Sequence, residues 1–386
     1  MSRPTMVDYV KQTPEVLRSQ IANDVAAPLV EAFCTGSYRR VRIVACGSSR
    51  NGSLVGRHYL RHMLQREVII TEPYTFCAYE HELPDDEFCF VVSQSGYSTN
   101  ALAALETIRA AGRPAIGLTG DPSSDFKDAA DILVDYGVGE ELVGYVTKGV
   151  TSFAFFLALF GIGVAQREGR LDEAGVEAEY AKLEQIITRF EQATIQVPAT
   201  IDARYKELSS MERVMLVGAG ANYGVACEGA LKYGETLQIP AVGFELEEYL
   251  HGPNLQISPE YTIFFMSVGT RDHERCRQLV DATRLVTDRV FWLTDDAGAE
   301  QPDLLIDPCG DSLLSPAAVL PFFQISAWQL TEDKHLWHKH PLVAKFDAAL
   351  SGKKFCSLHI FLTAVTRSFH INVYQFSGFH RIPFTD

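Results

Sequence analysis

The sequence has few cysteines and no long apolar run, and each shortage excludes a class of protein. Eight cysteines among 386 residues are too few for a disulfide scaffold, and none of them forms a C-x-x-C pair. We therefore expect a reduced, cytoplasmic protein. The longest apolar run, residues 153–165, is shorter than the ~20 residues that cross a bilayer, and no apolar signal stretch follows Met1. This pattern predicts a buried helix over residues 153–165 and no contact with a membrane.

Basic residues are also scarce. The chain has 34 Lys and Arg against 49 Asp and Glu, which gives a formal net charge of -15. A protein that binds nucleic acid needs a basic face, so nucleic acid is not an expected partner. The content of 47% hydrophobic and 22% charged residues is that of a globular protein, and at ~150 residues per domain the length predicts two to three domains.

The sequence contains an internal repeat at an offset of 173 residues. Apolar, β-rich runs that end in glycine and small polar residues recur in the same order, which indicates strand–turn–helix units. The matched pairs are 40–49 with 213–222, 88–92 with 261–265 and, slightly out of register, 115–119 with 290–294. Continuous apolar strands are typical of buried parallel sheets. We therefore predict an α/β protein with two tandem, doubly wound, three-layer α/β/α lobes, each with a central parallel sheet.

Changes in composition suggest the boundaries of these lobes. We expect the first lobe over residues 1–170, a helical connector over 171–207, the second lobe over 208–350, and an arm or atypical tail over 351–386. The connector has apolar residues at helical spacing and a predicted break near Pro198. The first helical stretch, predicted over Pro14 to Cys34, is expected to pack on the first sheet. From Lys353 onward a single acidic residue, Asp386, stands against six phenylalanines and three histidines.

Residues 93–100 form a hydroxyl-rich loop between an apolar strand and a helix-like run over 101–111. Free backbone N–H groups, the helix dipole and several hydroxyls would suit a phosphate, although Ser or Thr before a helix is also a common N-cap. The second copy has Met266 at the position of Ser93 and Val268 at that of Ser95, so the fold itself does not require hydroxyls there. We predict an anion site in the first lobe only.

A second turn of small residues, Gly47-Ser48-Ser49, is expected at the same carboxyl edge of the sheet, where open α/β sheets bind ligands. It could close over the phosphate or the sugar. Its spacing differs from that of the G-x-G-x-x-G fingerprint, so no nicotinamide cofactor is expected.

Glu228, Lys232 and Glu235 stand at i, i+4 and i+7 and would share one face of a helix. The alternative is a solvated row of ion pairs. Small residues at positions 229, 230 and 234 favour close approach by another element, because glycine is a poor choice for an exposed helix.

His251 precedes Gly252-Pro253, a turn signal, and a histidine so presented could transfer protons near neutral pH. A lone histidine is more often structural. His335, His338 and His340 lack matching carboxylate or cysteine spacing, so no metal is expected.

These residues together resemble the sugar isomerase (SIS) family, in particular the isomerase half of glutamine-fructose-6-phosphate amidotransferases. The resemblance covers about residues 6–350. It is carried by Met6-x5-Gln12-x-Pro14, Ala45-Cys46-Gly47-x-Ser49, Ser93-Gln94-Ser95-Gly96, Thr147-Lys148, residues 228–235, and Glu248-x-x-His251-Gly252-Pro253. It implies flavodoxin-like SIS lobes.

The resemblance also implies roles for individual residues. Glu235 would move a proton between C1 and C2, with Lys232 and Glu228 in the same site, and His251 would assist ring opening from the partner subunit of a homodimer or a dimer of dimers. The late Leu-Ala-Lys motif of the family matches only Val343-Ala344-Lys345, which makes Lys345 a further catalytic candidate. The expected sugar- and phosphate-binding residues are Gly47, Ser48, Ser49, Ser93, Gln94, Ser95, Ser98 and Lys148.

Departures from the family pattern point to a different amine or sugar. Tyr97 stands where the amidotransferase has glutamate, Arg50 replaces an aromatic residue, and the sequence lacks the glutaminase domain with its cysteine nucleophile.

We expect an enzyme, without metal or redox cofactor, that releases ammonia or an amine from a 6-phosphorylated amino sugar or fructosamine, as a deaminating isomerase or deglycase. The alternatives are a simple aldose–ketose isomerase and a phosphosugar sensor without catalysis. Arg50 is either a surface cation or a partner for the carboxylate of an amino-acid leaving group.

Overall fold

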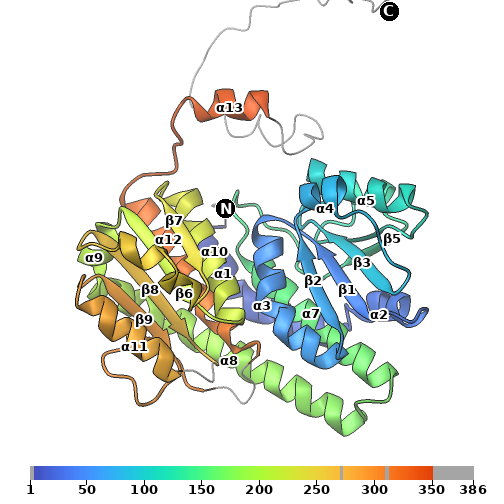
Figure 1. The fold of residues 1–386 in the computed structure, drawn as a ribbon, viewed down its shortest axis with the longest axis horizontal. Coiled ribbons are helices and arrows are strands. Elements are labelled where there is room, and N and C mark those ends of the chain that lie inside the picture. Colours follow the sequence, from blue (N-terminus) through green and yellow to red (C-terminus); the bar gives the residue numbers. More distant parts are fainter. Residues whose placement is uncertain (1–3, 270–272, 309–312, 351–386) are drawn as a thin grey trace, which may run out of the picture.

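The computed structural model describes residues 4–269, 273–308 and 313–350, so the predicted tail over 351–386 lies outside the described residues. Two α/β lobes stand side by side, each built on one sheet (Figure 1). The predicted connector region contains the long helix α8 (Glu173–Ala203) and the short α9 (Tyr205–Ser209).

Each lobe has a five-stranded sheet in which every pair of neighbouring strands is parallel. The first sheet has the order β2-β1-β3-β4-β5, and the second has the order β10-β9-β8-β6-β7. When the second order is given from β7 to β10, it matches the first, with β6 to β10 in the places of β1 to β5. This confirms the predicted doubly wound repeat. The strands are β1 (Arg40–Val44), β2 (Glu67–Thr71), β3 (Glu87–Val92), β4 (Ile116–Thr119), β5 (Ile132–Asp135), β6 (Arg213–Gly218), β7 (Ala241–Phe244), β8 (Tyr261–Ser267), β9 (Val290–Thr294) and β10 (Leu304–Leu305).

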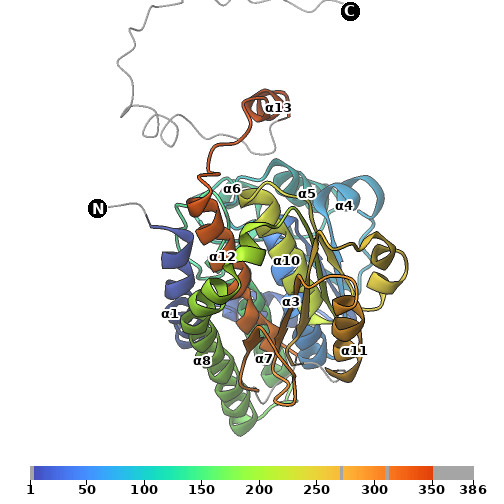
Figure 2. The ribbon, with the colours of Figure 1, turned by 90° about the vertical axis from the view of Figure 1, so that its left-hand side faces the viewer.

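Helices cover both faces of each sheet (Figures 1 and 2). In the first lobe they are α1 (Met6–Ala22), α2 (Ala27–Cys34), α3 (Gly47–Leu64), α4 (Pro73–Tyr79), α5 (Thr99–Ala110), α6 (Phe126–Ala129) and α7 (Lys148–Arg167). The second lobe and its C-terminal extension contain α10 (Ala221–Thr236), η1 (Glu248–Leu250), η2 (Pro253–Gln256), α11 (His273–Arg284), η3 (Ser315–Val319), α12 (Leu320–Asp333) and α13 (Val343–Ala349).

The inner faces of the two sheets share one hydrophobic core. In β3, Phe88 and Phe90 enter this core, whereas Cys89 and Val91 point to a separate cluster under α4, α5 and α6. The alternation follows from the two-residue period of a strand. Phe264 of β8 belongs to the same hydrophobic core as Phe90 of β3. The two lobes are therefore packed against each other and are not joined by the connector alone.

The apolar run over residues 153–165 lies inside α7 and is buried, as predicted. Among the described residues, α7 is the one helix that has the length and apolarity to cross a membrane, and 89% of its most apolar window is buried in the protein.

The predicted break at Pro198 is wrong, because α8 continues through this residue to Ala203. A proline inside a helix removes one backbone hydrogen bond. Here Val197 and Ile201, both fully buried, keep the flanking turns packed in the shared core. Tertiary packing therefore outweighs the local cost of the proline.

The N-terminal helix also differs from its prediction. It begins at Met6, where Thr5 and Asp8 form a reciprocal capping box, and Pro14 lies inside it. The predicted stretch contains two helices: α1 packs mainly against α7, α8 and α12, whereas in α2 the ring of Phe33 packs edge-on against Phe88 of β3, with the ring centroids 5.1 Å apart, so the predicted packing on the first sheet holds for α2.

The lobes meet closely where α10 lies against α3. A Cβ at Gly224 would stand 2.6 Å from the backbone nitrogen of Val55. The predicted close approach also holds at Gly229, where a Cβ would meet Phe323 at 2.8 Å, but is wrong at Gly234, where nothing lies within 4 Å.

We predict that Gly224→Ala lowers the free energy of unfolding by ~1–3 kcal/mol, because the backbone it would strike cannot rotate aside. Gly234→Ala on the same helix is the matched control and should be neutral or stabilise by up to ~1 kcal/mol, since alanine favours helix. Urea denaturation of both variants measures the difference. Equal stability would contradict the close packing of α10 on α3.

Candidate active site

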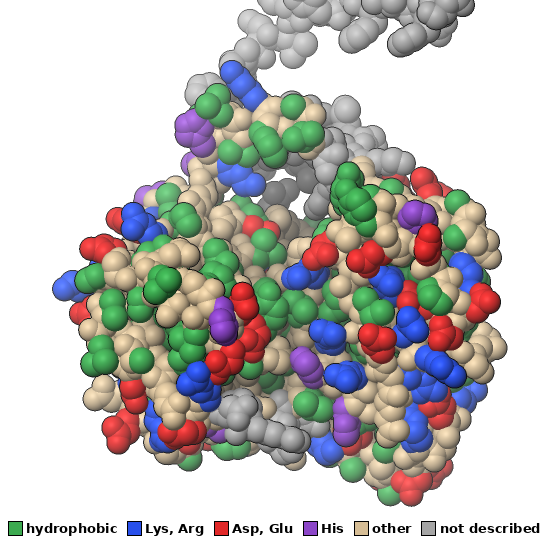
Figure 3. All heavy atoms as spheres, viewed as in Figure 1, with side chains coloured by type: hydrophobic (Ala, Val, Ile, Leu, Met, Phe, Trp, Pro, Cys, Tyr) green, Lys and Arg blue, Asp and Glu red, His purple; other side chains and the backbone are tan. Residues whose placement is uncertain are grey.

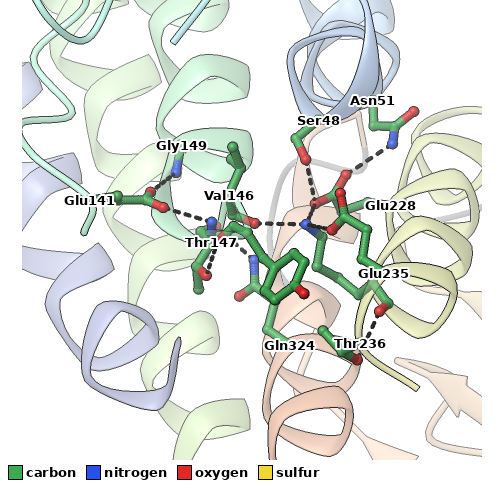
Figure 4. A network of polar contacts seen from close by, with 12 residues as sticks. Ser48, Asn51, Glu141, Val146, Thr147, Gly149, Glu228, Glu235, Thr236 and Gln324 are labelled. Atoms are coloured by element: carbon green, nitrogen blue, oxygen red, sulfur yellow. Dashed lines mark hydrogen bonds and ion pairs between the residues drawn. The ribbon is translucent and has the colours of Figure 1, made fainter. Parts of the chain in front are cut away.

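Three charged side chains of α10 form one cluster (Figure 4). The Nζ of Lys232 lies 2.7 Å from Oε2 of Glu235 and 3.4 Å from Oε1 of Glu228. The side chains of Glu228 and Lys232 are 0% exposed and that of Glu235 is 31% exposed. The predicted shared helical face is therefore confirmed, and the alternative of a solvated row of ion pairs is wrong.

The first lobe completes this cluster. The Ser48 hydroxyl donates to Oε1 of Glu228 at 3.0 Å, and the Asn51 amide donates to Oε2 at 2.9 Å. Lys232 donates to the carbonyl oxygen of Val146, in the segment before α7, at 3.0 Å. The cluster is therefore fully paired only when the two lobes are packed together.

Burial and charge act in opposite directions on these groups. Burial raises the pKa of Glu228, and the charge of Lys232 is the largest effect that opposes it. Burial alone would lower the pKa of Lys232, but Glu228 and Glu235 outweigh it and the net shift is upward. Lys232 therefore stays a cation at neutral pH, and its three N–H groups face three oxygens. It holds the partly exposed Glu235 carboxylate at the edge of solvent, where that group can exchange a proton with a bound molecule.

A cleft of about 620 Å³ opens beside Glu235. Its lining comes from α3, α10, β7 and the residue before α4: Gly47, Arg50, Asn51, Glu72, Cys227, Ala230, Leu231, Gly234, Glu235, Ala241, Val242 and Gly243. Figure 3 shows hydrophobic side chains in the hollow between the lobes, with both basic and acidic side chains on its first-lobe side and acidic ones on its second-lobe side. The cleft thus offers a partly exposed carboxylate next to a largely apolar wall.

An ion pair also lines this cleft. The Nε of Arg50 lies 2.6 Å from Oε1 of Glu72, and the side chains are 30% and 47% exposed. Burial raises the pKa of the Cys227 thiol, while hydrogen bonding from Tyr223 and the charge of Arg50 oppose this shift. Arg50 is therefore a cleft residue with a carboxylate partner rather than an isolated surface cation.

The hydroxyl-rich loop stands at the carboxyl end of β3, as predicted. The hydroxyl oxygens of Ser93 and Ser95 accept hydrogen bonds from the backbone N–H groups of Gly96 at 3.2 Å and Tyr97 at 3.4 Å. Ser98 occupies the N-cap position of α5 but makes no side-chain capping bond, and its hydroxyl bonds to Asn100 instead. Helix capping by Ser98 therefore does not account for the loop.

Glycine is required at position 96 of this loop. Its φ is +65°, and a Cβ there would stand 1.8 Å from the hydroxyl oxygen of Ser124. In the second lobe, Met266 and Val268 are buried in the shared core at the positions that match Ser93 and Ser95. At these two matched positions, only the first of the two equivalent loops has hydroxyl side chains.

The comparisons with known proteins agree with this fold. The family model described as "SIS domain" matches residues 37–161 and 207–298, more than half of the chain. The chain belongs to the SIS domain family. This confirms the family expected from the motifs.

The SIS protein is 24% identical over 347 residues to the glutamine–fructose-6-phosphate aminotransferase (isomerizing) of Gloeobacter violaceus, and the match covers 86% of this chain and 54% of the relative. The chain spans about half the length of the curated relatives it matches.

Solved structures share the fold. A Clostridium difficile 630 protein with a proposed phosphosugar isomerase activity has a TM-score of 0.81 at 24% identity, covering 91% of this chain and 99% of that chain. The C-terminal domain of the Francisella tularensis glucosamine-fructose-6-phosphate aminotransferase has a TM-score of 0.76 at 18% identity, covering 87% and 98%. Glucosamine-6-phosphate deaminase of Thermotoga maritima has a TM-score of 0.64 at 17% identity, covering 86% and 95%.

Within this SIS protein, the predicted residues Gly47 and Ser48 lie beside the α10 cluster, but Ser48 donates its hydroxyl to Glu228. Ser49 follows in the first turn of α3, where its carbonyl oxygen accepts a hydrogen bond from the Ser53 hydroxyl at 2.8 Å.

Lys148, another predicted residue, is buried, and its ammonium group lies over the ring of Tyr9, 5.1 Å from the centroid. Burial lowers its pKa. Lys148 is therefore held against α1, with Glu141 and Glu140 as its electrostatic neighbours.

Two further predicted residues do not join the cluster within one chain. Lys345 is exposed on α13, which stands clear of both lobes (Figures 1 and 2). His251 is exposed just after η1, and its described electrostatic neighbour is Glu247 rather than Glu235. A role for either residue at Glu235 requires another copy of the chain or a different placement of α13.

Several residues that build the site were missed by sequence reasoning. Gln94, by contrast, was predicted, and it packs against α7, where a Cβ at Gly149 would stand 1.9 Å from its Oε1. Glu141 accepts hydrogen bonds from the backbone N–H groups of Thr147 at 2.8 Å and Gly149 at 2.7 Å, which anchors the start of α7 (Figure 4). Gln324 of α12 donates to the carbonyl oxygen of Thr147 at 2.7 Å. Nothing in the local pattern around Glu141 signals this role, whereas Asn51, one helical turn after Ser48, could have been found by spacing.

In the portion of the chain that the structure describes, no group of three or more His, Cys, Asp or Glu side chains could hold a metal ion. His335, His338 and His340 are all exposed. The arrangement at Glu235 is suited to proton transfer by side chains of the protein.

Proposed function

We propose that this protein is a phosphosugar enzyme that isomerises a 6-phosphorylated amino sugar or fructosamine and releases ammonia or an amine. The observation that carries the proposal is the partly exposed Glu235 carboxylate held by a buried lysine beside a 620 Å³ cleft. The hydroxyl-rich loop that ends β3 supports a phosphate group on the substrate, because backbone N–H groups and hydroxyls at the start of α5 favour an anion. By name, the related aminotransferases act on fructose 6-phosphate and the deaminase of similar fold acts on glucosamine 6-phosphate, which supports a phosphorylated hexose or amino hexose as the substrate class.

The proposed chemistry follows from these groups. On a 1-amino ketose phosphate, Glu235 removes the proton from C1 and returns it to C2, while the amine nitrogen loses one proton and the C2 oxygen gains one, so that the ketone and amine become a hydroxyl and an imine. Water then adds to the imine carbon, the C–N bond breaks, and the amine leaves with the proton, so that the net reaction consumes one water. For a 2-amino aldose phosphate the same proton moves from C2 to C1 before the imine is hydrolysed. Lys232 acts as a positioning residue that keeps Glu235 in place and lowers the cost of negative charge nearby.

Assays with a panel of purified substrates test this function. Glucosamine 6-phosphate, a 6-phosphofructosamine and an unsubstituted ketose phosphate should be incubated separately, with free amine and sugar phosphate measured in each case. Release of amine from either of the first two compounds supports the proposal. Turnover of the unsubstituted sugar alone would identify a simple aldose–ketose isomerase, and binding without turnover of any compound would identify a phosphosugar sensor.

We also propose a cytoplasmic homodimer. A reducing compartment is supported by six cysteines that are free in the described residues. The dimer is supported by His251, which is exposed in one chain although its role in ring opening needs it at a cleft.

Mixing two inactive variants tests whether His251 acts across subunits. His251→Ala and Glu235→Gln dimers should each be inactive alone. When they are mixed and allowed to exchange subunits, each heterodimer would contain one intact site, and activity should return to up to about one quarter of wild type in a one-to-one mixture, since half the dimers are mixed and each has one of two sites. A mixture that remains inactive after verified exchange would show that each site is complete within one chain.

A further inference from the structure

We infer that the cleft receives the leaving amine as an α-amino acid joined to the sugar through its side-chain amine, with Arg50 binding its carboxylate and Glu72 its free ammonium group. This inference rests on the proposed function and names the class of leaving group.

The first observation is the position of the ion pair. Arg50 belongs to the first turn of α3, and Glu72 immediately precedes α4, yet both line the same cleft as Glu235. Asn51, next to Arg50 in the chain, is bonded to Glu228 of the α10 cluster at 2.9 Å. A molecule whose reacting carbon is held at Glu235 can therefore extend toward Arg50 and Glu72 within one cleft.

The second observation is the hydrogen-bonding capacity that the ion pair leaves open. A guanidinium group has five N–H donors; the described bond to Glu72 uses the one at Nε, and Arg50 also interacts with the side chains of Cys227 and Tyr223, so up to three donors are engaged and the others can meet a ligand. The Glu72 side chain is 47% exposed, so its carboxylate is accessible. A ligand with one carboxylate and one ammonium group gives each member of the pair an additional partner of opposite charge without burying an unpaired charge.

The third observation is the wall between these groups. Ala230, Leu231, Ala241 and Val242 line the cleft, and Val242 is 49% exposed, which is high for a large hydrophobic residue. The aliphatic part of an amino-acid side chain would cover this surface, whereas ammonia would leave it in contact with water. An amino acid linked through its α-amine would keep its carboxylate but lose the free ammonium group that Glu72 is placed to bind.

The stability of the fold does not account for the Arg50–Glu72 ion pair. Exposed ion pairs contribute little to folding. An arginine and a glutamate held together at the wall of a cleft, beside a proton-transfer carboxylate, are better explained by recognition of a zwitterion.

Three 6-phosphofructosamines separate the possible contributions: one formed from the side-chain amine of lysine, one from glycine and one from ethylamine. Arg50→Gln should lower kcat/KM by about tenfold for the lysine and glycine adducts, the loss expected for a charge-assisted hydrogen bond, and by less than about twofold for the ethylamine adduct. Glu72→Gln should impair the lysine adduct alone. Free lysine should inhibit the wild-type enzyme as a product more strongly than ethylamine does.

Arg61→Gln is the matched control, since Arg61 is an exposed arginine of α3 that does not line the cleft. It should leave all three substrates unchanged. An equal loss for all three substrates in Arg50→Gln, or no loss in any, overturns the zwitterion subsite while leaving amine release by the wild-type enzyme intact. Failure of the wild-type enzyme to release any amine overturns the proposed function itself, so the two failures are distinguishable.

Discussion

Glu235→Gln should lower kcat by about 10²–10⁴-fold and leave phosphosugar binding nearly unchanged, because the amide keeps the shape of the side chain but cannot accept and return a proton. The Nζ of Lys232 can still donate to the remaining side-chain oxygen, so the fold of α10 is retained. Turnover of the best substrate from the panel and calorimetric binding of a non-reactive sugar 6-phosphate measure the two effects.

Glu177→Gln provides the control for this substitution, since Glu177 is an exposed carboxylate of α8 remote from the cleft lining. It should have wild-type activity. If Glu235→Gln lost binding and thermal stability together with turnover, or kept more than about a tenth of wild-type activity, the assignment of the proton-transfer role to Glu235 would be wrong.

Glu228→Ala should destabilise the protein by about 3–5 kcal/mol, the cost of removing one partner from a buried ion pair. The substitution leaves the buried Lys232 with less compensating charge and leaves the Ser48 hydroxyl and the Asn51 amide without their acceptor. The effect is large because the carboxylate links both lobes. Urea denaturation measures the change in the free energy of unfolding.

Two comparisons make this second result specific. Glu177→Ala, on the exposed face of α8, should change stability by less than about 0.5 kcal/mol. The double variant Glu228→Gln with Lys232→Met should be more stable than Glu228→Ala, because it removes the uncompensated charge. A loss of less than about 1 kcal/mol in Glu228→Ala would mean that the cluster does not help to hold the lobes together.

The fold was largely predictable because its signals are local and repeated. Continuous apolar strands, each followed by small residues and a helix, identify parallel α/β units, and their recurrence at one offset predicts two lobes of the same topology. The errors fell where packing between distant segments outweighs local preference. Pro198 stays inside α8 because residues on either side of it are buried in the shared core.

The site was predictable to the extent that it lies on one element. Glu228, Lys232 and Glu235 share a face of α10 because the helical period requires it. Sequence spacing carries no information on which groups from the other lobe meet them, so the contacts of Ser48 and the carbonyl oxygen of Val146 were not anticipated.

The sequence by itself determined the α/β class, the tandem repeat, the hydroxyl-rich loop and the charged face of α10, since each depends on residues close together in the chain. The tertiary structure alone decided that Lys148 is held against α1, that Lys345 stands apart on α13, and that Arg50 pairs with Glu72 at the wall of the cleft. These positions depend on how separate elements pack. The net charge is that of the whole chain, but the charges that face one cleft are brought together only by folding.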